Sequence, residues 1–213
     1  MKSRSGVFKP QTEGDAQYHS FVPAPLPPIP TIAIDTELSH LLVQASNWIG
    51  KLESSVTLIP NIALFISLYV RKEALMSAQI KGTQCTLEDI FDPEIEENAT
   101  GDVANVVHYI RAMTYALNRL SELSLGNRLL RETHAVLMGS EKTPGEFRTS
   151  QNWIGPSGVS LKRSTFIPPH PDDMIEALSN LEAYMNGDDS LNVLIQAAFI
   201  HSWMAMATLG AYL

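Results

Sequence analysis

Residues 102–123 read Asp-Val-Ala-Asn-Val-Val-His-Tyr-Ile-Arg-Ala-Met-Thr-Tyr-Ala-Leu-Asn-Arg-Leu-Ser-Glu-Leu. Their apolar residues have the helical spacing that dominates the chain from Asp35 on. Apolar side chains recur here every three or four residues, at Val103, Val106, Val107, Ile110, Met113 and Leu117. An α-helix turns once every 3.6 residues or so, and this spacing therefore gathers those side chains on one face. The stretch predicts a helix with one buried side.

The same period continues toward the N-terminus. Asp35 or Thr36 can cap a helix that carries Leu38, Leu41, Leu42, Ala45, Trp48 and Ile49 on one face. Pro60 can open a second helix, with Leu64, Phe65, Leu68 and Tyr69 facing inward, and Gly82 should end or bend it. Thr86 and Asp89 have the spacing of another helix start, before an acidic, loop-like stretch at 92–101.

Toward the C-terminus, helical spacing returns at 126–138, 172–185 and from residue 191 onward. Residues 146–169 break it with Gly155, Pro156 and Gly158, and apolar residues near Val159 alternate, which predicts a hairpin-like flap. Residues 1–31 are rich in proline and predict an extended arm over the surface, in preference to a ligand for an aromatic groove. The fold class expected is mainly α with a small β flap.

Composition narrows the function classes. The chain has 213 residues, long enough for one sizeable core, and a formal net charge of −8 that argues against a general nucleic-acid binder. Its one cysteine, Cys85, cannot form an internal disulfide, and the first residues lack the apolar core of a secretion signal. We therefore expect a reducing, cytoplasmic location.

Several segments together resemble the Fic family of protein AMP-transferases. The helix that carries the family's inhibitory motif resembles residues 69–84, Tyr-Val-Arg-Lys-Glu-Ala-Leu-Met-Ser-Ala-Gln-Ile-Lys-Gly-Thr-Gln. The N-terminal region of one branch resembles Phe21-Val-Pro-Ala-Pro-Leu-Pro-Pro28 and Ile59-Pro-Asn61. The strand and flap region resembles Pro144-Gly-Glu-Phe-Arg148, Gln151-Asn-Trp-Ile-Gly155 and Ser164-Thr-Phe-Ile-Pro-Pro169. The helix that leads to the active site resembles Leu194-Ile-Gln-Ala-Ala-Phe-Ile-His201.

The resemblance runs in order from about residue 7 to 203. It implies a Fic-type helical core with an N-terminal helical extension, divided into an N-terminal region at 1–100 and a Fic domain at 101–213. Active members of the family transfer AMP from ATP to a hydroxyl side chain of a target protein. They use a histidine as general base, a glycine-rich phosphate cradle, an acidic residue that holds Mg²⁺, and an arginine. The motif is His-Pro-Phe-x-Asp-Gly-Asn-Gly-Arg.

That motif is absent from this sequence. After Trp203 the chain reads Met204-Ala-Met-Ala-Thr-Leu-Gly-Ala-Tyr-Leu213, without a carboxylate, a Gly-x-Gly cradle or an arginine. Codons for Asp-Gly-Asn-Gly read in a shifted frame can give Met-Ala-Met-Ala, which suggests a truncated remnant. His201 fits an earlier helix position better than the catalytic one. We expect no catalytic residue, no metal site and no productive binding of ATP or Mg²⁺. An active transferase with other residues and a non-enzymatic interaction module remain the alternatives.

The resemblance also implies two positions outside the catalytic motif. The family's inhibitory motif is Ser-x-x-x-Glu-Gly, and it aligns with residues 77–82. Its three defined positions are Ser77, Lys81 and Gly82, with Lys81 in place of the glutamate. That exchange either removes the restraint or, as we favour, leaves a solvated residue without a partner arginine. In the flap, Ser164, Thr165, Phe166 and Ile167 would dock the target. His170, in a turn flanked by prolines, is expected to be solvent-exposed and not catalytic.

The last 23 residues, Leu191 to Leu213, lack Lys, Arg, Asp and Glu and are long enough to cross a bilayer. Asn192, Gln196, His201 and Ser202 interrupt the run, and the Fic resemblance explains its first half as a buried helix. We therefore expect that this segment does not cross a membrane. The target protein is not identifiable from the sequence, which also leaves a homodimer open.

Overall fold

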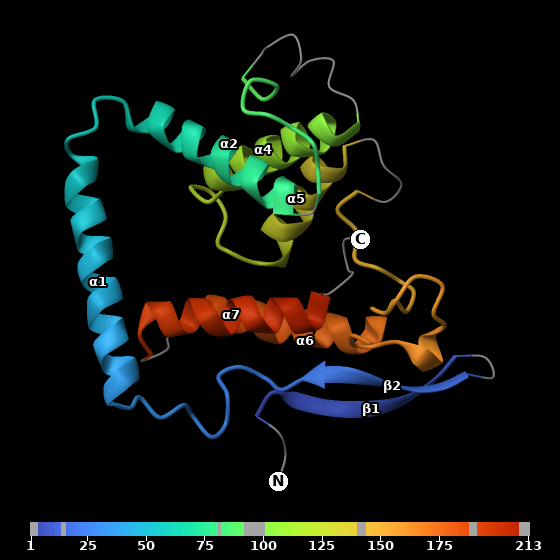
Figure 1. Ribbon diagram of the computed structural model, residues 1–213. Helices are drawn as coiled ribbons and strands as arrows, with labels where there is room; N and C mark the ends of the chain where they lie inside the picture. The colour runs from blue at the N-terminus through green and yellow to red at the C-terminus, as the bar shows by residue number, and fades with distance from the viewer. Residues whose placement is uncertain are drawn as a thin grey trace. The chain divides into compact units, whose positions relative to one another are not determined.

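The computed structural model describes residues 4–13, 16–80, 82–91, 101–139, 144–187 and 191–208 (Figure 1). Two strands come first, β1 (Gly6–Glu13) and β2 (Ala16–Pro23). The helices follow: α1 (Thr36–Val56), α2 (Ile62–Ile80), α4 (Gly101–Arg119), α5 (Asn127–Met138), the short 3₁₀ helix η1 (Leu161–Arg163), α6 (Pro171–Met185) and α7 (Val193–Thr208). The expected fold class, mainly α with a small β-hairpin, is confirmed.

Contacts divide the chain into two compact units. The first unit comprises Met1–Ala33, Leu125–Asn127 and Phe147–Leu213, and the second comprises Ile34–Ser124 and Arg128–Glu146. These units are defined by contacts between residues, whereas the boundary expected after residue 100 separates two regions of the family's sequence. That boundary stays a prediction. Each unit has its own core.

The core of the second unit lies between α2 and α4. Its buried members are Ala74, Leu75, Cys85, Ile90, Val106 and Ile110. The helix expected at 102–123 is confirmed as α4, and Val106, Val107 and Ile110 lie on its buried side. Leu117, placed on that side by its spacing, is 45% exposed, because it lies near the end of α4, beyond the part that contacts this core. Thr86 and Asp89 exchange hydrogen bonds as a helix start would, and a turn follows through Phe91.

The predicted inward face of the second helix is wrong, and the apolar face of the first helix is not buried either. Asp35 caps α1 as expected, since its carboxylate accepts a hydrogen bond from the Leu38 N–H at 2.8 Å. None of the residues of α1 is buried, however, and Trp48 is 68% exposed. In α2 the cap is Asn61, not Pro60, and the N-terminal half of the helix is likewise exposed, including Leu64, Leu68 and Tyr69. The described part of this unit offers them no buried position, because α4 covers only the second half of α2.

The core of the first unit gathers around α6 and α7, which lie side by side (Figure 1). Met174, Ala177, Leu178 and Leu181 of α6 meet Trp203 of α7 there. The N-terminal hairpin adjoins this pair, and its buried side chains include Tyr18, Ser20 and Phe21 of β2. This unit therefore joins the two ends of the chain.

The hairpin is a correction to the predicted arm. The strands Gly6–Glu13 and Ala16–Pro23 form a regular antiparallel ladder in which Val7 pairs with Val22 and Phe8 with Phe21. Pro10 lies on β1, which pairs only with β2 in this two-stranded sheet, and an edge strand tolerates the missing N–H of a proline. The arm itself begins at Ala24. In the predicted flap, by contrast, the strand pairing reduces to a single bridge between Ile154 and Phe166.

Candidate functional site

The flap at residues 151–169 closes through its backbone. The Ile154 N–H donates to the Phe166 carbonyl at 2.8 Å, and the Phe166 N–H donates back to the Ile154 carbonyl at 3.1 Å. Inside the loop the Trp153 indole N–H donates to the Val159 carbonyl at 3.0 Å. Ser164 Oγ donates to the Leu161 carbonyl at 2.7 Å, at the end of η1. The flap is thus held by local hydrogen bonds despite its short ladder.

The base of the flap is fastened to the N-terminal hairpin. The buried amide of Gln151 accepts from the Tyr18 hydroxyl at 3.3 Å and donates to the Pro168 carbonyl at 3.1 Å. The Phe21 N–H of β2 donates to the Ile167 carbonyl at 2.8 Å. The sequence offered no signal for these partners, because they are more than 130 residues apart.

Arg148, the last residue of the Pro144-Gly-Glu-Phe-Arg148 segment, also supports the flap. Its guanidinium donates to the Ser150 carbonyl at 3.0 Å and to the Pro169 carbonyl. Burial lowers the pKa of Arg148 from its ordinary value. A charged donor held against two carbonyls fixes both ends of the flap, a role that the sequence alone did not indicate.

The four predicted docking residues line one groove. A cavity of about 410 Å³ lies between the flap and the hairpin, and Ser164, Thr165, Phe166 and Ile167 all line it. Other lining residues include Phe8, Tyr18 and His19 of the hairpin and Lys162 of the flap. Thr165 is exposed and the other three predicted residues are partly buried. The structure therefore brings these residues together on one surface.

The inhibitory-motif positions lie in the other unit, at the end of α2. Gly82 has a φ of +88°, and its N–H donates to the Gln79 carbonyl, while the Thr83 N–H donates to the Ala78 carbonyl. Glycine favours this left-handed end of a helix because it has no Cβ. Gly82 therefore ends α2 as the sequence predicted. Lys81 lies outside the described residues.

Ser77 has a local partner. Its Oγ donates to Glu73 Oε1 at 3.0 Å, and the Tyr109 hydroxyl of α4 donates to the same carboxylate at 3.0 Å. Burial and the Glu73 carboxylate raise the pKa of Tyr109 to about 12. Glu73 therefore links α2 to α4, a role that its position in the sequence did not indicate.

The helix that resembles the approach to the active site is α7. Asn192 caps it by accepting from the Leu194 N–H at 2.9 Å, and Ile195 and Trp203 are its buried residues. His201 is exposed. The helix continues through Met204, Ala205 and Met206 to Thr208 without a break.

Two further observations concern metals and membranes. In the described ranges there is no group of three or more His, Cys, Asp or Glu side chains that could hold a metal ion. Across the same ranges, no helix is both long and apolar enough to cross a membrane. His170, expected to be exposed, is about one-third exposed at its side chain and caps α6 by accepting from the Asp172 N–H at 3.4 Å.

Comparison with known proteins gives concordant matches. The model of the Fic/DOC family N-terminal region matches residues 39–118, and that of the Fic/DOC family matches residues 123–207. A Fic family protein from Desulfovibrio desulfuricans G20, known from a crystal structure, resembles the chain with a TM-score of 0.57 and 14% sequence identity. The match covers 83% of this chain and 53% of that one, and this chain therefore spans about half the length of its structural relative.

Proposed function

Because this chain belongs to the Fic/DOC family, we propose that it is a relative of the protein AMP-transferases that docks a target protein but, with these 213 residues, does not transfer AMP. The single observation that supports the lack of transfer is the continuity of α7 through Met204, Ala205 and Met206. Met204 to Ala207 is the stretch that a shifted reading frame would produce from the family's Asp-Gly-Asn-Gly.

A phosphate cradle needs backbone N–H groups that have no partner inside a helix. Within a helix, only the first turn offers such free N–H groups, because each later N–H donates to the carbonyl four residues before it. Met204, Ala205 and Met206 lie well past the first turn of α7. Their N–H groups are therefore committed to the helix, and this segment does not suit a nucleotide phosphate.

The side chains of α7 argue in the same direction. Val193–Thr208 contains no Asp or Glu to hold Mg²⁺ and no Arg to neutralise a phosphate chain. His201 is exposed, on a helix with no carboxylate of its own. The residues of α7 do not fit ATP with Mg²⁺, and we derive no catalytic step through either group.

The test is transfer of labelled AMP. The chain is incubated with ATP labelled at the α-phosphate, Mg²⁺ and cell lysate, and protein-bound label is measured after electrophoresis. We expect no label above that of a boiled sample, and no difference between the chain and its His201→Ala variant. Label that depends on the folded chain would contradict the proposal, and its loss in His201→Ala would make His201 the general base.

The target-docking part of the proposal is supported by the groove beside the flap. Family members use this region to hold the target, and here Ser164, Thr165, Phe166 and Ile167 line a cavity with the hairpin. Gln151 and Arg148 hold the flap in place without a target. A fixed surface loses little conformational freedom on binding, which favours recognition.

Docking is tested with a matched pair of variants. Thr165→Arg places a large side chain in the groove, and Thr57→Arg makes the same change at an exposed position after α1. We expect a stoichiometric partner to be recovered with the unmodified chain and with Thr57→Arg, and lost with Thr165→Arg. Equal recovery with both variants would place the partner elsewhere.

At the inhibitory position, Lys81 replaces the family's glutamate, and we propose that it has no regulatory role because α7, the helix that resembles the approach to the active site, carries no arginine to face it. We therefore expect no ATP binding by calorimetry, either for the unmodified chain or for its Lys81→Glu variant. Measurable ATP binding in either form would contradict this. The cytoplasmic location and the homodimer remain predictions.

A further inference from the structure

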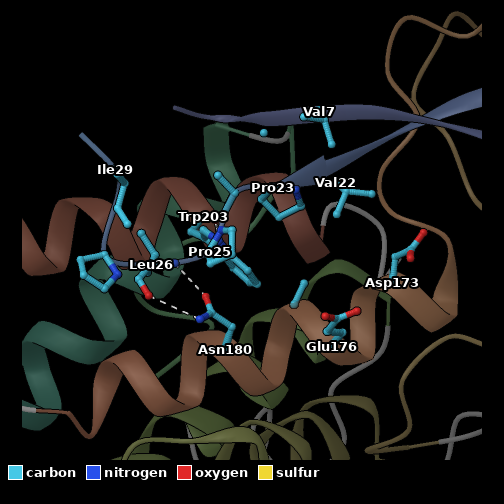
Figure 2. A pocket seen from close by; sticks show the side chains of 14 residues that line it. Val7, Val22, Pro23, Pro25, Leu26, Ile29, Asp173, Glu176, Asn180 and Trp203 are labelled. Carbon is cyan, nitrogen blue, oxygen red and sulfur yellow. Dashed lines mark hydrogen bonds between the residues drawn. The ribbon is translucent and has the colours of Figure 1, made fainter. Parts of the chain in front are cut away.

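A second cavity lies in the first unit, apart from the flap groove. It has a volume of about 570 Å³ and is bounded by the hairpin, the start of the proline-rich arm, α6 and α7 (Figure 2). Its apolar wall includes Val22, Pro23, Pro25, Leu26, Ile29 and Trp203. Cavities of about 300–1,000 Å³ with apolar walls and a few polar groups are typical small-molecule sites. We name it the α6 cavity.

The arm side of the α6 cavity is held in place by three sets of hydrogen bonds. The Asn180 amide of α6 accepts from the Leu26 N–H at 2.8 Å and donates to the Leu26 carbonyl at 3.4 Å, as the dashed lines in Figure 2 show. The Trp203 indole N–H donates to the Ala24 carbonyl at 3.0 Å. The Ala24 N–H donates to the Ser5 carbonyl at 3.0 Å. The wall is therefore formed before any ligand arrives.

The polar side of the cavity is acidic. Asp173 and Glu176 of α6 line it, and Figure 2 shows both carboxylates on the same side, across from the arm. Asp173 is bound by Lys9 Nζ at 2.6 Å and by the Gln11 amide at 2.9 Å. Glu176 is exposed on the next turn.

The local charge balance is negative. The pKa of Lys9 is raised first by its hydrogen bond to Asp173 and then by the charge of that carboxylate, with smaller contributions from Glu176 and Asp172. Asp173 thus binds the Lys9 ammonium directly, and the second lining carboxylate, that of Glu176, has no ion pair among the described contacts. A further cation would be attracted here and an anion repelled, since the neighbouring charges leave an excess of negative charge.

We propose that the α6 cavity binds a small organic cation, a primary ammonium on an apolar aliphatic or aromatic body. The ammonium lies at Glu176, beside the Asp173–Lys9 pair, and the apolar body lies against Pro23, Leu26 and Trp203. This site is separate from the flap groove and does not depend on the proposed function. Its acidic edge disfavours a nucleotide as occupant.

Trp203 supplies the reporter for the test. It lines the cavity at 2% exposure, whereas Trp48 and Trp153 are exposed and line neither this cavity nor its edge. In the Trp48→Phe, Trp153→Phe chain, Trp203 is the sole tryptophan. We titrate hexylamine, hexan-1-ol and hexanoate and record Trp203 emission. Hexylamine should give a saturable change, hexan-1-ol a change with a midpoint about three- to tenfold higher, and hexanoate none.

A matched pair of variants then tests whether the Glu176 carboxylate binds the ammonium. Glu176→Gln should raise the hexylamine midpoint to that of hexan-1-ol and leave hexan-1-ol unchanged. Glu53→Gln removes the same charge from exposed α1 and should alter neither midpoint. Equal midpoints for hexylamine and hexanoate, insensitivity of hexylamine to Glu176→Gln, or no saturation by any of the three probes would each overturn the proposal.

Discussion

At the scale of the residue, the three tryptophans show how differently one side chain can be used. Trp203 is buried among Met174, Leu178 and Leu181 of α6 and donates its indole N–H to the Ala24 carbonyl. Trp48 is 68% exposed on α1. Burial of an aromatic side chain contributes both its transfer free energy and its packing, so the two residues should differ strongly in their contribution to stability.

We expect Trp203→Ala to lower the free energy of unfolding by about 3–5 kcal/mol, because it leaves a cavity in the core and an unpaired carbonyl. Trp48→Ala should change it by no more than about 0.5 kcal/mol. Urea denaturation followed by circular dichroism measures both. Similar losses in the two variants would mean that α1 is covered in solution.

Two glycines provide a second comparison at this scale. Gly145 and Gly158 both have left-handed φ angles, of +74° and +78°. A Cβ on Gly145 would lie 2.7 Å from the Arg131 carbonyl oxygen, whereas one on Gly158 would meet nothing within 4 Å. The Gly145 backbone also donates to His134 Nδ1 at 3.0 Å and accepts from Arg131 Nε at 2.8 Å.

Gly158→Ala should therefore cost only the backbone strain, about 1–2 kcal/mol. Gly145→Ala should cost more, because a backbone clash with the Arg131 carbonyl adds to the same strain and displaces the backbone that bonds His134 and Arg131. The difference is measured by thermal or urea unfolding. If Gly158→Ala were the more damaging of the two, the tight packing of the Pro144-Gly-Glu-Phe-Arg148 segment would be refuted.

At the scale of the element, α2 and α4 are joined by a polar contact beside their apolar core. The Tyr109 hydroxyl of α4 donates to Glu73 of α2, and the pKa of Tyr109 is raised to about 12. A tyrosine whose pKa is higher in the folded state than in the unfolded chain holds its proton more tightly when folded. Its contribution to stability is complete below about pH 10 and is lost as the pH rises toward 12.

We predict that Glu73→Gln lowers the pKa of Tyr109, since the charge and the acceptor that disfavour the phenolate are removed. Difference absorbance of phenolate against pH, between the chain and the variant, measures the shift. Ser77→Ala removes only the second donor to Glu73 and serves as the control, with a smaller effect in the opposite direction or none. A Tyr109 pKa that is unchanged in Glu73→Gln would leave burial as its sole cause.

At the scale of the whole molecule, net charge is the property that composition alone supplies. A formal charge of −8 opposes the release of counterions that drives non-specific binding to nucleic acid. We expect no binding to a labelled random DNA duplex at 150 mM salt by fluorescence anisotropy. Binding in the micromolar range that weakens as salt is added would show that a local basic surface outweighs the total charge.

The local elements and the family follow from the sequence alone. Helical spacing predicted α4, the carboxylate of Asp35 predicted the start of α1, and Gly82 predicted the end of α2. Each of these features depends on residues within one or two helical turns of one another. A short stretch of sequence is therefore enough to predict it. The ordered family segments likewise needed only the chain itself, and the family matches at 39–118 and 123–207 agree with them.

By contrast, the burial of each apolar face and the grouping of distant residues into a site depend on how the whole chain folds. The periodicity of α1 offers an apolar face, but burial requires a second surface, and none of its residues is buried here. The pairing of β1 with β2 escaped prediction because Pro10 argues against a strand unless the strand is known to be an edge. The flap groove and the α6 cavity join the first 30 residues to residues beyond 160. Such contacts depend on the three-dimensional path of the chain, which no local pattern specifies.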